Sequence, residues 1–127
     1  MPRILVIDDE EIVRYTLRKV LERSGYEVMV ASNGAEGIQL FRENPADLII
    51  TDILMPEQDG LKTIAALCEE SPGVKIIAMS GGGRTGRLDF LPAAEHLGAV
   101  LTLLKPLPPS ELLEAVEMTL GTRLRGK

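Results

Sequence analysis

Apolar residues follow two alternating patterns along this chain of 127 residues. Short continuous apolar runs are typical of strands buried on both faces of a sheet, whereas apolar residues recurring every three or four positions predict amphipathic helices. The alternation predicts an α/β fold with a parallel sheet covered by helices on both faces. We expect strands over residues 4–7, 27–31, 47–52, 74–80 and 100–104, and helices over residues 12–25, 33–44, 60–70, 89–98 and 110–120.

Local signals support the boundaries of the first two helices. Gly25 is a plausible stop for the first helix, and Asn33 followed by Glu36 forms a capping-box pattern at the start of the second. We expect the first helix to bury one face against the sheet, formed by Ile12, Leu17, Val20 and Leu21.

Composition and charge exclude several classes of protein. The net charge of −5 argues against direct binding of nucleic acid, for which a basic stripe would be expected. The single cysteine, Cys68, cannot form an internal disulfide, which fits a reducing compartment. No signal peptide is recognisable, and no apolar run approaches the roughly 18 residues of a membrane span. We therefore expect one cytoplasmic domain over residues 1–127, with residues 121–127 as a basic tail or the start of a linker.

Polar residues follow the expected strands at the points where these end. Asp8 and Asp9 follow the first strand, while Asp52, Ser80 and Lys105 end the third, fourth and fifth. Singly, each has an ordinary alternative role, as a helix cap, a loop residue or a surface charge. Because ligands of open parallel sheets bind beyond the carboxyl ends of the strands, their joint position favours a functional site.

Gathered carboxylates repel one another unless a cation lies among them. Mg²⁺ prefers such oxygen ligands, whereas a zinc site would need a cluster of Cys or His, and His96 stands alone as a surface residue. Beside Mg²⁺, one carboxylate can attack phosphorus and become an aspartyl phosphate. The metal and the Lys105 ammonium would then neutralise the phosphoryl oxygens.

The glycines after the fourth strand suggest a nucleotide-binding loop, but their context argues against one. Gly81, Gly83 and Gly86 have the spacing of a dinucleotide fingerprint, which belongs after the first strand of such a fold. A phosphate-binding P-loop would need Lys and Ser or Thr where Arg87 and Leu88 stand. We interpret these glycines as residues that give the backbone of the loop after Ser80 the freedom to move.

Four motifs at the strand ends together resemble the receiver domain of two-component response regulators over nearly the whole chain. They are the acid pair Asp8-Asp9, the sequence DILMPEQDG beginning at Asp52, the hydroxyl residue Ser80, and Lys105-Pro106. The resemblance implies a doubly wound, flavodoxin-like (βα)5 fold with strand order 2-1-3-4-5.

The resemblance also implies a set of Mg²⁺ ligands. Asp9 and Asp52 would bind the ion directly, together with the backbone carbonyl of Leu54. Asp8 would act largely through water.

Further roles are implied for the phosphoryl site. Asp52 would accept the phosphoryl group, Lys105 would pair with Asp52 and then with this group, and Ser80 would move to donate a hydrogen bond to it. The bond between Lys105 and Pro106 is usually cis in the family, and an X-Pro bond is where a cis peptide costs least.

The chain departs from the family pattern at the expected switch. Thr102 replaces the aromatic residue that usually turns inward when the hydroxyl residue, here Ser80, moves. Leu54 and Gly82 offer no polar group to position an attacking water. We therefore expect switching to work mainly through the segment 81–88 and the helix that follows it.

The resulting hypothesis is a phosphorylation-controlled switch whose only chemistry is its own phosphorylation and dephosphorylation, and not an enzyme acting on other substrates. A sensor histidine kinase or a histidine phosphotransfer protein would supply the phosphoryl group. Output would pass through the face formed by residues 89–98, 100–104 and 110–120 to an effector domain or partner protein, and a homodimer remains an option. The alternative is a Mg²⁺-dependent phosphohydrolase with an aspartyl-phosphate intermediate, although Leu54 occupies the place of the second acid that such enzymes commonly need.

Overall fold

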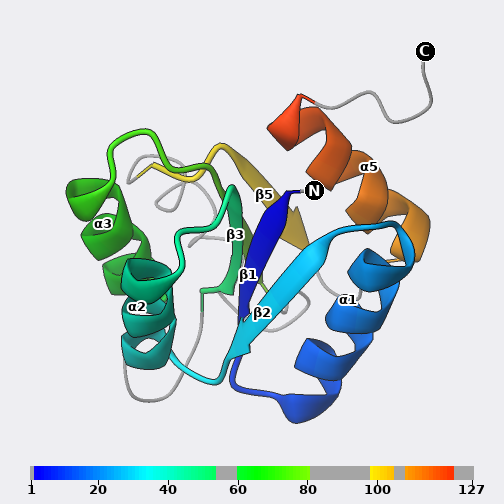
Figure 1. Ribbon diagram of the computed structural model, residues 1–127, viewed down its shortest axis with the longest axis horizontal. Coiled ribbons are helices and arrows are strands. Elements are labelled where there is room, and N and C mark those ends of the chain that lie inside the picture. The colour runs from blue at the N-terminus through cyan, green and yellow to red at the C-terminus, as the bar shows by residue number, and fades with distance from the viewer. Residues whose placement is uncertain (1, 54–59, 81–97, 105–107, 122–127) are drawn as a thin grey trace.

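The computed structural model describes residues 2–53, 60–80, 98–104 and 108–121, and these residues contain one five-stranded sheet (Figure 1). All four pairs of neighbouring strands are parallel, and the order β2-β1-β3-β4-β5 confirms the predicted topology. The strands are β1 (Arg3–Ile7), β2 (Glu27–Ala31), β3 (Leu48–Asp52), β4 (Ile76–Ser80) and β5 (Leu101–Leu104).

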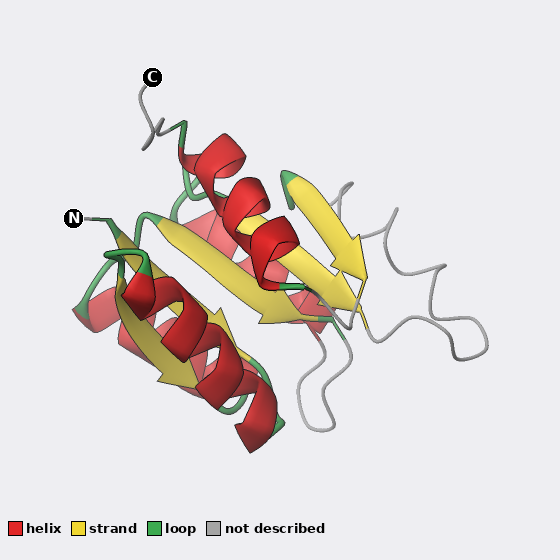
Figure 2. Ribbon diagram, turned by 90° about the vertical axis from the view of Figure 1, so that its right-hand side faces the viewer, coloured by secondary structure: helices red, strands yellow, loops and turns green. Residues whose placement is uncertain are grey.

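The helices among the described residues are α1 (Glu11–Arg23), α2 (Gly34–Glu43), α3 (Gly60–Glu70) and α5 (Pro109–Leu120). They cover both faces of the sheet (Figure 1). Figure 2 shows α1 and α5 in front of the strands, with α2 and α3 behind. The helix predicted over residues 89–98 lies outside the described residues, apart from Gly98.

The two faces of the sheet carry separate hydrophobic cores. In β1, Ile4 and Val6 face the core that includes side chains of α1 and α5, whereas Leu5 and Ile7 face the core beneath α2 and α3. All four side chains are fully buried. Because successive side chains of a strand point to opposite faces, a strand covered on both sides needs the continuous apolar run seen in the sequence.

The predicted roles of Gly25 and Asn33 at the helix ends are confirmed, although α1 itself ends at Arg23 and Glu36 contacts a different residue than the capping box implies. Gly25 follows α1 with φ of 96°, a left-handed conformation that suits glycine. The side-chain oxygen of Asn33 accepts a hydrogen bond from the Glu36 N–H at 2.8 Å. The Glu36 carboxylate accepts bonds from the backbone N–H and hydroxyl of Ser32, one residue before the expected partner, and these bonds lower the pKa of Glu36.

The prediction that Ile12 lies on the buried face of α1 is wrong. Its side chain is 68% exposed, whereas Leu17 and Leu21 are buried. At roughly 100° per residue, Ile12 lies about 140° around the helix from Leu17. Val13, four residues before Leu17, packs against the core in its place.

No helix among the described residues is long and apolar enough to cross a membrane.

Candidate functional site

The predicted acids meet at the carboxyl edge of the sheet, toward which the strand arrowheads point in Figure 2. Asp52 is the last residue of β3, and its neighbours in the sheet are β1 and β4. Asp8 and Asp9 directly follow β1. The β1–β3 register pairs Ile7 with Thr51, so both strands reach the carboxyl edge of the sheet at nearly the same level.

The carboxylates of Asp8, Asp9 and Asp52 form a cluster. Each residue offers one carboxylate oxygen, and these oxygens all lie within 4.8 Å of one another. Asp8 and Asp52 are buried, with 0% and 5% exposure, whereas Asp9 is exposed. The cluster therefore has a buried base and one acid facing solvent.

Hydrogen bonds hold Asp8 through both its backbone and its side chain. Its N–H donates to the Ala31 carbonyl at the end of β2, at 3.1 Å. Its Oδ1 accepts from the Glu10 N–H at 2.9 Å, and its carbonyl oxygen accepts from Nη1 of Arg14 at 2.8 Å. The loop that carries Asp8 and Asp9 is thereby tied both to the neighbouring strand and to α1.

The backbone around Asp52 is held by a close approach of α3. The Gly60 N–H donates to the Ile53 carbonyl at 2.5 Å, and the Ile53 N–H donates to the Met79 carbonyl at 2.9 Å. A Cβ at Gly60 would overlap the Asp52 carbonyl oxygen and the Cα of Ile53. In the sequence, Gly60 stood out only as the last letter of the motif DILMPEQDG, and the contact explains why a glycine is needed.

The predicted hydroxyl and switch residues lie on adjacent strands. Ser80 ends β4 and is fully buried. Thr102 in β5 is half-buried and pairs in register with Ala78, two residues before Ser80. The expectations for Leu54, Gly82, Lys105 and Pro106 lie outside the described residues.

The donor set fits a hard divalent cation. Carboxylate oxygens are the ligands that Mg²⁺ prefers, and oxygens bound to one Mg²⁺ at roughly 2.1 Å lie about 3–4 Å apart. The three carboxylate oxygens, all within 4.8 Å of one another, approach this spacing. Mutual repulsion of the acids would be relieved by such an ion.

The sequence profile of the response regulator receiver domain matches residues 4–117. The chain belongs to this family. It is 33% identical to the chemotaxis protein CheY of Thermotoga maritima over 115 residues, which cover 90% of this chain and 93% of that protein. It is also 33% identical over 117 residues to the transcriptional regulatory protein SrrA of Staphylococcus aureus, covering 92% of this receiver domain but 47% of SrrA.

Solved structures agree with this assignment. A receiver domain from Clostridium thermocellum superposes with a TM-score of 0.87 at 32% identity, covering 95% of each chain. The response regulator TrrA of Thermotoga maritima, solved in complex with Mg²⁺ and BeF, gives a TM-score of 0.84 at 31% identity, covering 94% of this chain and 99% of TrrA. The receiver fold predicted from the sequence is therefore confirmed.

Proposed function

We propose that this receiver domain accepts one phosphoryl group on Asp52 and changes its contacts with a partner as a result. The observation that carries the proposal is the cluster of three carboxylates within 4.8 Å at the carboxyl edge of the sheet. Asp52 is the member of this cluster that ends the central strand β3. The resemblance of its surrounding motif to the family's acceptor motif supports Asp52 as the nucleophile.

The chemistry proposed for the site is an in-line phosphoryl transfer. A carboxylate oxygen of Asp52 forms a bond to phosphorus while the bond from phosphorus to the donor breaks, and the leaving group keeps the electron pair. Asp9 and Asp52, with Asp8 acting largely through water and Leu54 through its carbonyl, would hold Mg²⁺. When bound, this ion would neutralise charge on the phosphoryl oxygens.

Three further residues take part in the proposed site and its switch. Lys105 would pair with Asp52 before transfer and with the phosphoryl group afterwards. Ser80, buried at the end of β4, would donate a hydrogen bond from its hydroxyl to a phosphoryl oxygen. Thr102 would take the place of the usual aromatic switch residue on β5.

The proposed partners follow from family membership. A histidine kinase or a histidine phosphotransfer protein in the cytoplasm would be the phosphoryl donor. The output surface would comprise β5, α5 and the segment 89–98, and it would contact an effector domain, a separate protein or a second copy. SrrA, about twice as long as this chain, is described as a transcriptional regulatory protein.

Phosphorylation by a small donor tests the proposal without a cognate kinase. Purified protein is incubated with acetyl phosphate, with Mg²⁺ or with a chelator, and intact mass is measured. We expect one phosphoryl group per chain with Mg²⁺, little without it, and none on Asp52→Asn. The matched control is Asp47→Asn, which changes an acid just before β3 and should be labelled like the unmodified protein.

Two results would contradict the proposal. Undiminished labelling of Asp52→Asn would remove Asp52 as the acceptor. Many turnovers of small phosphate esters, abolished in Asp52→Asn, would instead identify a phosphohydrolase.

A further inference from the structure

Arg14 of α1 contacts the backbone of the acid cluster. Its Nη1 donates a hydrogen bond of 2.8 Å to the carbonyl oxygen of Asp8. This carbonyl belongs to the peptide group that joins Asp8 to Asp9. The orientation of that peptide plane affects the directions in which both carboxylates leave the backbone.

Asp9 has little packing around it to fix its orientation, so a hydrogen bond to its backbone contributes more to its position. Asp9 is exposed, whereas Asp8 is fully buried and also bonded to Ala31 and Glu10. A hydrogen bond from a charged guanidinium is roughly twice as strong as one between neutral groups. Arg14 is itself half-buried, and its backbone N–H donates to the Glu10 carbonyl at 3.1 Å in the first turn of α1.

The charge of Arg14 has two opposing effects on a cation site. It attracts the acids, and it adds to the lowered pKa of Glu36 in α2, which is caused mainly by the hydrogen bonds from Ser32. The same charge repels a divalent cation. A purely electrostatic role would therefore make removal of Arg14 strengthen metal binding, whereas a positioning role would make removal weaken it.

We propose that Arg14 is a positioning residue for the metal site: it fixes the Asp8–Asp9 peptide so that the Asp9 carboxylate points at the metal position. This inference rests on the proposed function, since it assumes that Asp9 is a Mg²⁺ ligand. Mutating a residue that hydrogen-bonds to a metal ligand typically lowers metal affinity by 10- to 100-fold.

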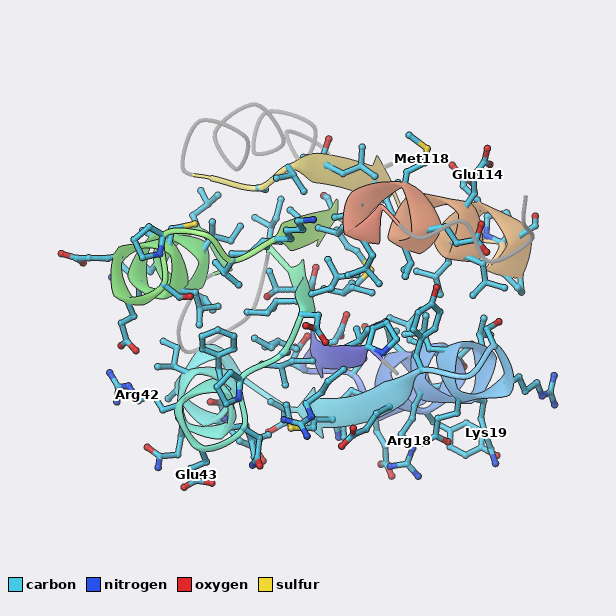
Figure 3. The ribbon with its side chains drawn as sticks, turned by 45° about the horizontal axis from the view of Figure 1, so that its top comes forward. Arg18, Lys19, Arg42, Glu43, Glu114 and Met118 are labelled. Atoms are coloured by element: carbon cyan, nitrogen blue, oxygen red, sulfur yellow. The ribbon has the colours of Figure 1, made fainter. Side chains whose placement is uncertain are left out.

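Arg18 provides a matched control on the same helix. Arg14 and Arg18 both line a surface cavity of about 260 Å³, together with Glu11, Tyr15 and Val30. Arg18 pairs with Glu22 at 3.8 Å, and its side chain is 45% exposed. Figure 3 shows Arg18 pointing away from the sheet, so replacing it removes an equal charge without touching the Asp8 carbonyl.

The test measures Mg²⁺ affinity by isothermal titration calorimetry on the full chain, well below the melting temperature. We expect Arg14→Met to weaken binding roughly tenfold and Arg14→Lys, which keeps a donor and the charge, to recover most of the loss. Arg18→Met should bind like the unmodified protein, and Asp9→Asn should lose most of its binding. Melting without Mg²⁺ is measured in parallel, because a merely structural role would lower the melting temperature and leave the affinity unchanged.

The outcomes separate the two proposals. Unchanged or tighter Mg²⁺ binding by Arg14→Met, while Asp9→Asn binds weakly, would overturn the positioning role and leave the proposed function standing. An equal loss in Arg18→Met would also overturn it, because the effect would then be one of general charge. Absence of Mg²⁺ binding by the unmodified protein would overturn both.

Discussion

Burial separates the roles of the three clustered acids. Asp8 and Asp52 lie almost wholly inside the protein, where an ionised carboxylate needs hydrogen bonds or a cation to offset lost hydration. Asp9 is exposed, so replacing it disturbs the packing least. Asp9→Asn is therefore the variant that best separates metal binding from folding.

The need for glycine at position 60 gives a prediction at the same scale. Gly60→Ala should lower the free energy of unfolding by about 1–3 kcal/mol, the usual cost of overpacking, because the new methyl group would overlap the Asp52 carbonyl and Ile53. Urea unfolding measures this change. Gly73→Ala is the control, since a Cβ there meets nothing within 4 Å.

The sign of the Gly60 effect is decisive. Helix propensity alone would favour alanine by up to about 1 kcal/mol. A Gly60→Ala protein as stable as Gly73→Ala would show that the backbone beside Asp52 tolerates a side chain, contrary to the contact described.

Sequence patterns could predict the acids but not the contacts that support them. Asp8, Asp9 and Asp52 could be found because each follows an apolar run, and parallel strands bring their carboxyl ends together. Arg14 looks in the sequence like any charged residue of a helix surface. Its bond to Asp8 depends on how α1 leaves β1, which is a property of the folded chain.

At the scale of the helices, an ion pair at the protein surface joins α2 to α3. Arg42 binds Glu70 through both Nε and Nη2, with Nε 3.0 Å from Oε1. Figure 3 shows Arg42 pointing into solvent from α2. The hydrogen bonds from Arg42 lower the pKa of Glu70, and those to Glu70 raise the pKa of Arg42.

The pH dependence of this pair follows from the lowered pKa of Glu70. A carboxyl group with a lower pKa in the folded state stabilises the protein above its unfolded pKa, and the contribution is lost as the pH falls through the folded value. In a double-mutant cycle of Arg42→Met and Glu70→Gln, we expect a small favourable coupling at neutral pH that disappears in acid and weakens with salt.

Glu43 supplies the control for this cycle. It lies next to Arg42 in α2 and accepts a hydrogen bond from the neutral Gln39 side chain at 2.7 Å. Glu43→Gln should show no coupling with Arg42→Met. A coupling with Glu70 that persists unchanged in acid would contradict an ionic origin.

The elements themselves were largely predictable because their signals are local. The strand at residues 27–31 and the helix at residues 60–70 agree with the structure at both ends. Ile12 was misplaced because the first turn of a helix offers too few apolar neighbours to fix its face. Val13, adjacent in sequence, satisfies the helical spacing to Leu17 better.

At the scale of the whole molecule, the two hydrophobic cores fix the carboxyl edge of the sheet. The sheet is covered on both sides, so the carboxyl ends of β1, β3 and β4 are fixed relative to one another (Figure 1). Such an edge can hold charged side chains close together without refolding. The strand order could be predicted only through resemblance, because alternating strands and helices allow several orders.

The central claim, that Asp52 is the phosphoryl acceptor, is tested most directly by locating the modification. Protein treated with Mg²⁺ and acetyl phosphate is reduced with borohydride, which converts an aspartyl phosphate to homoserine, and is then digested for tandem mass spectrometry. We predict homoserine at position 52, and none at positions 8 or 9. Homoserine at position 8 or 9 with an unmodified Asp52, or a phosphate ester retained on a hydroxyl residue, would contradict the account.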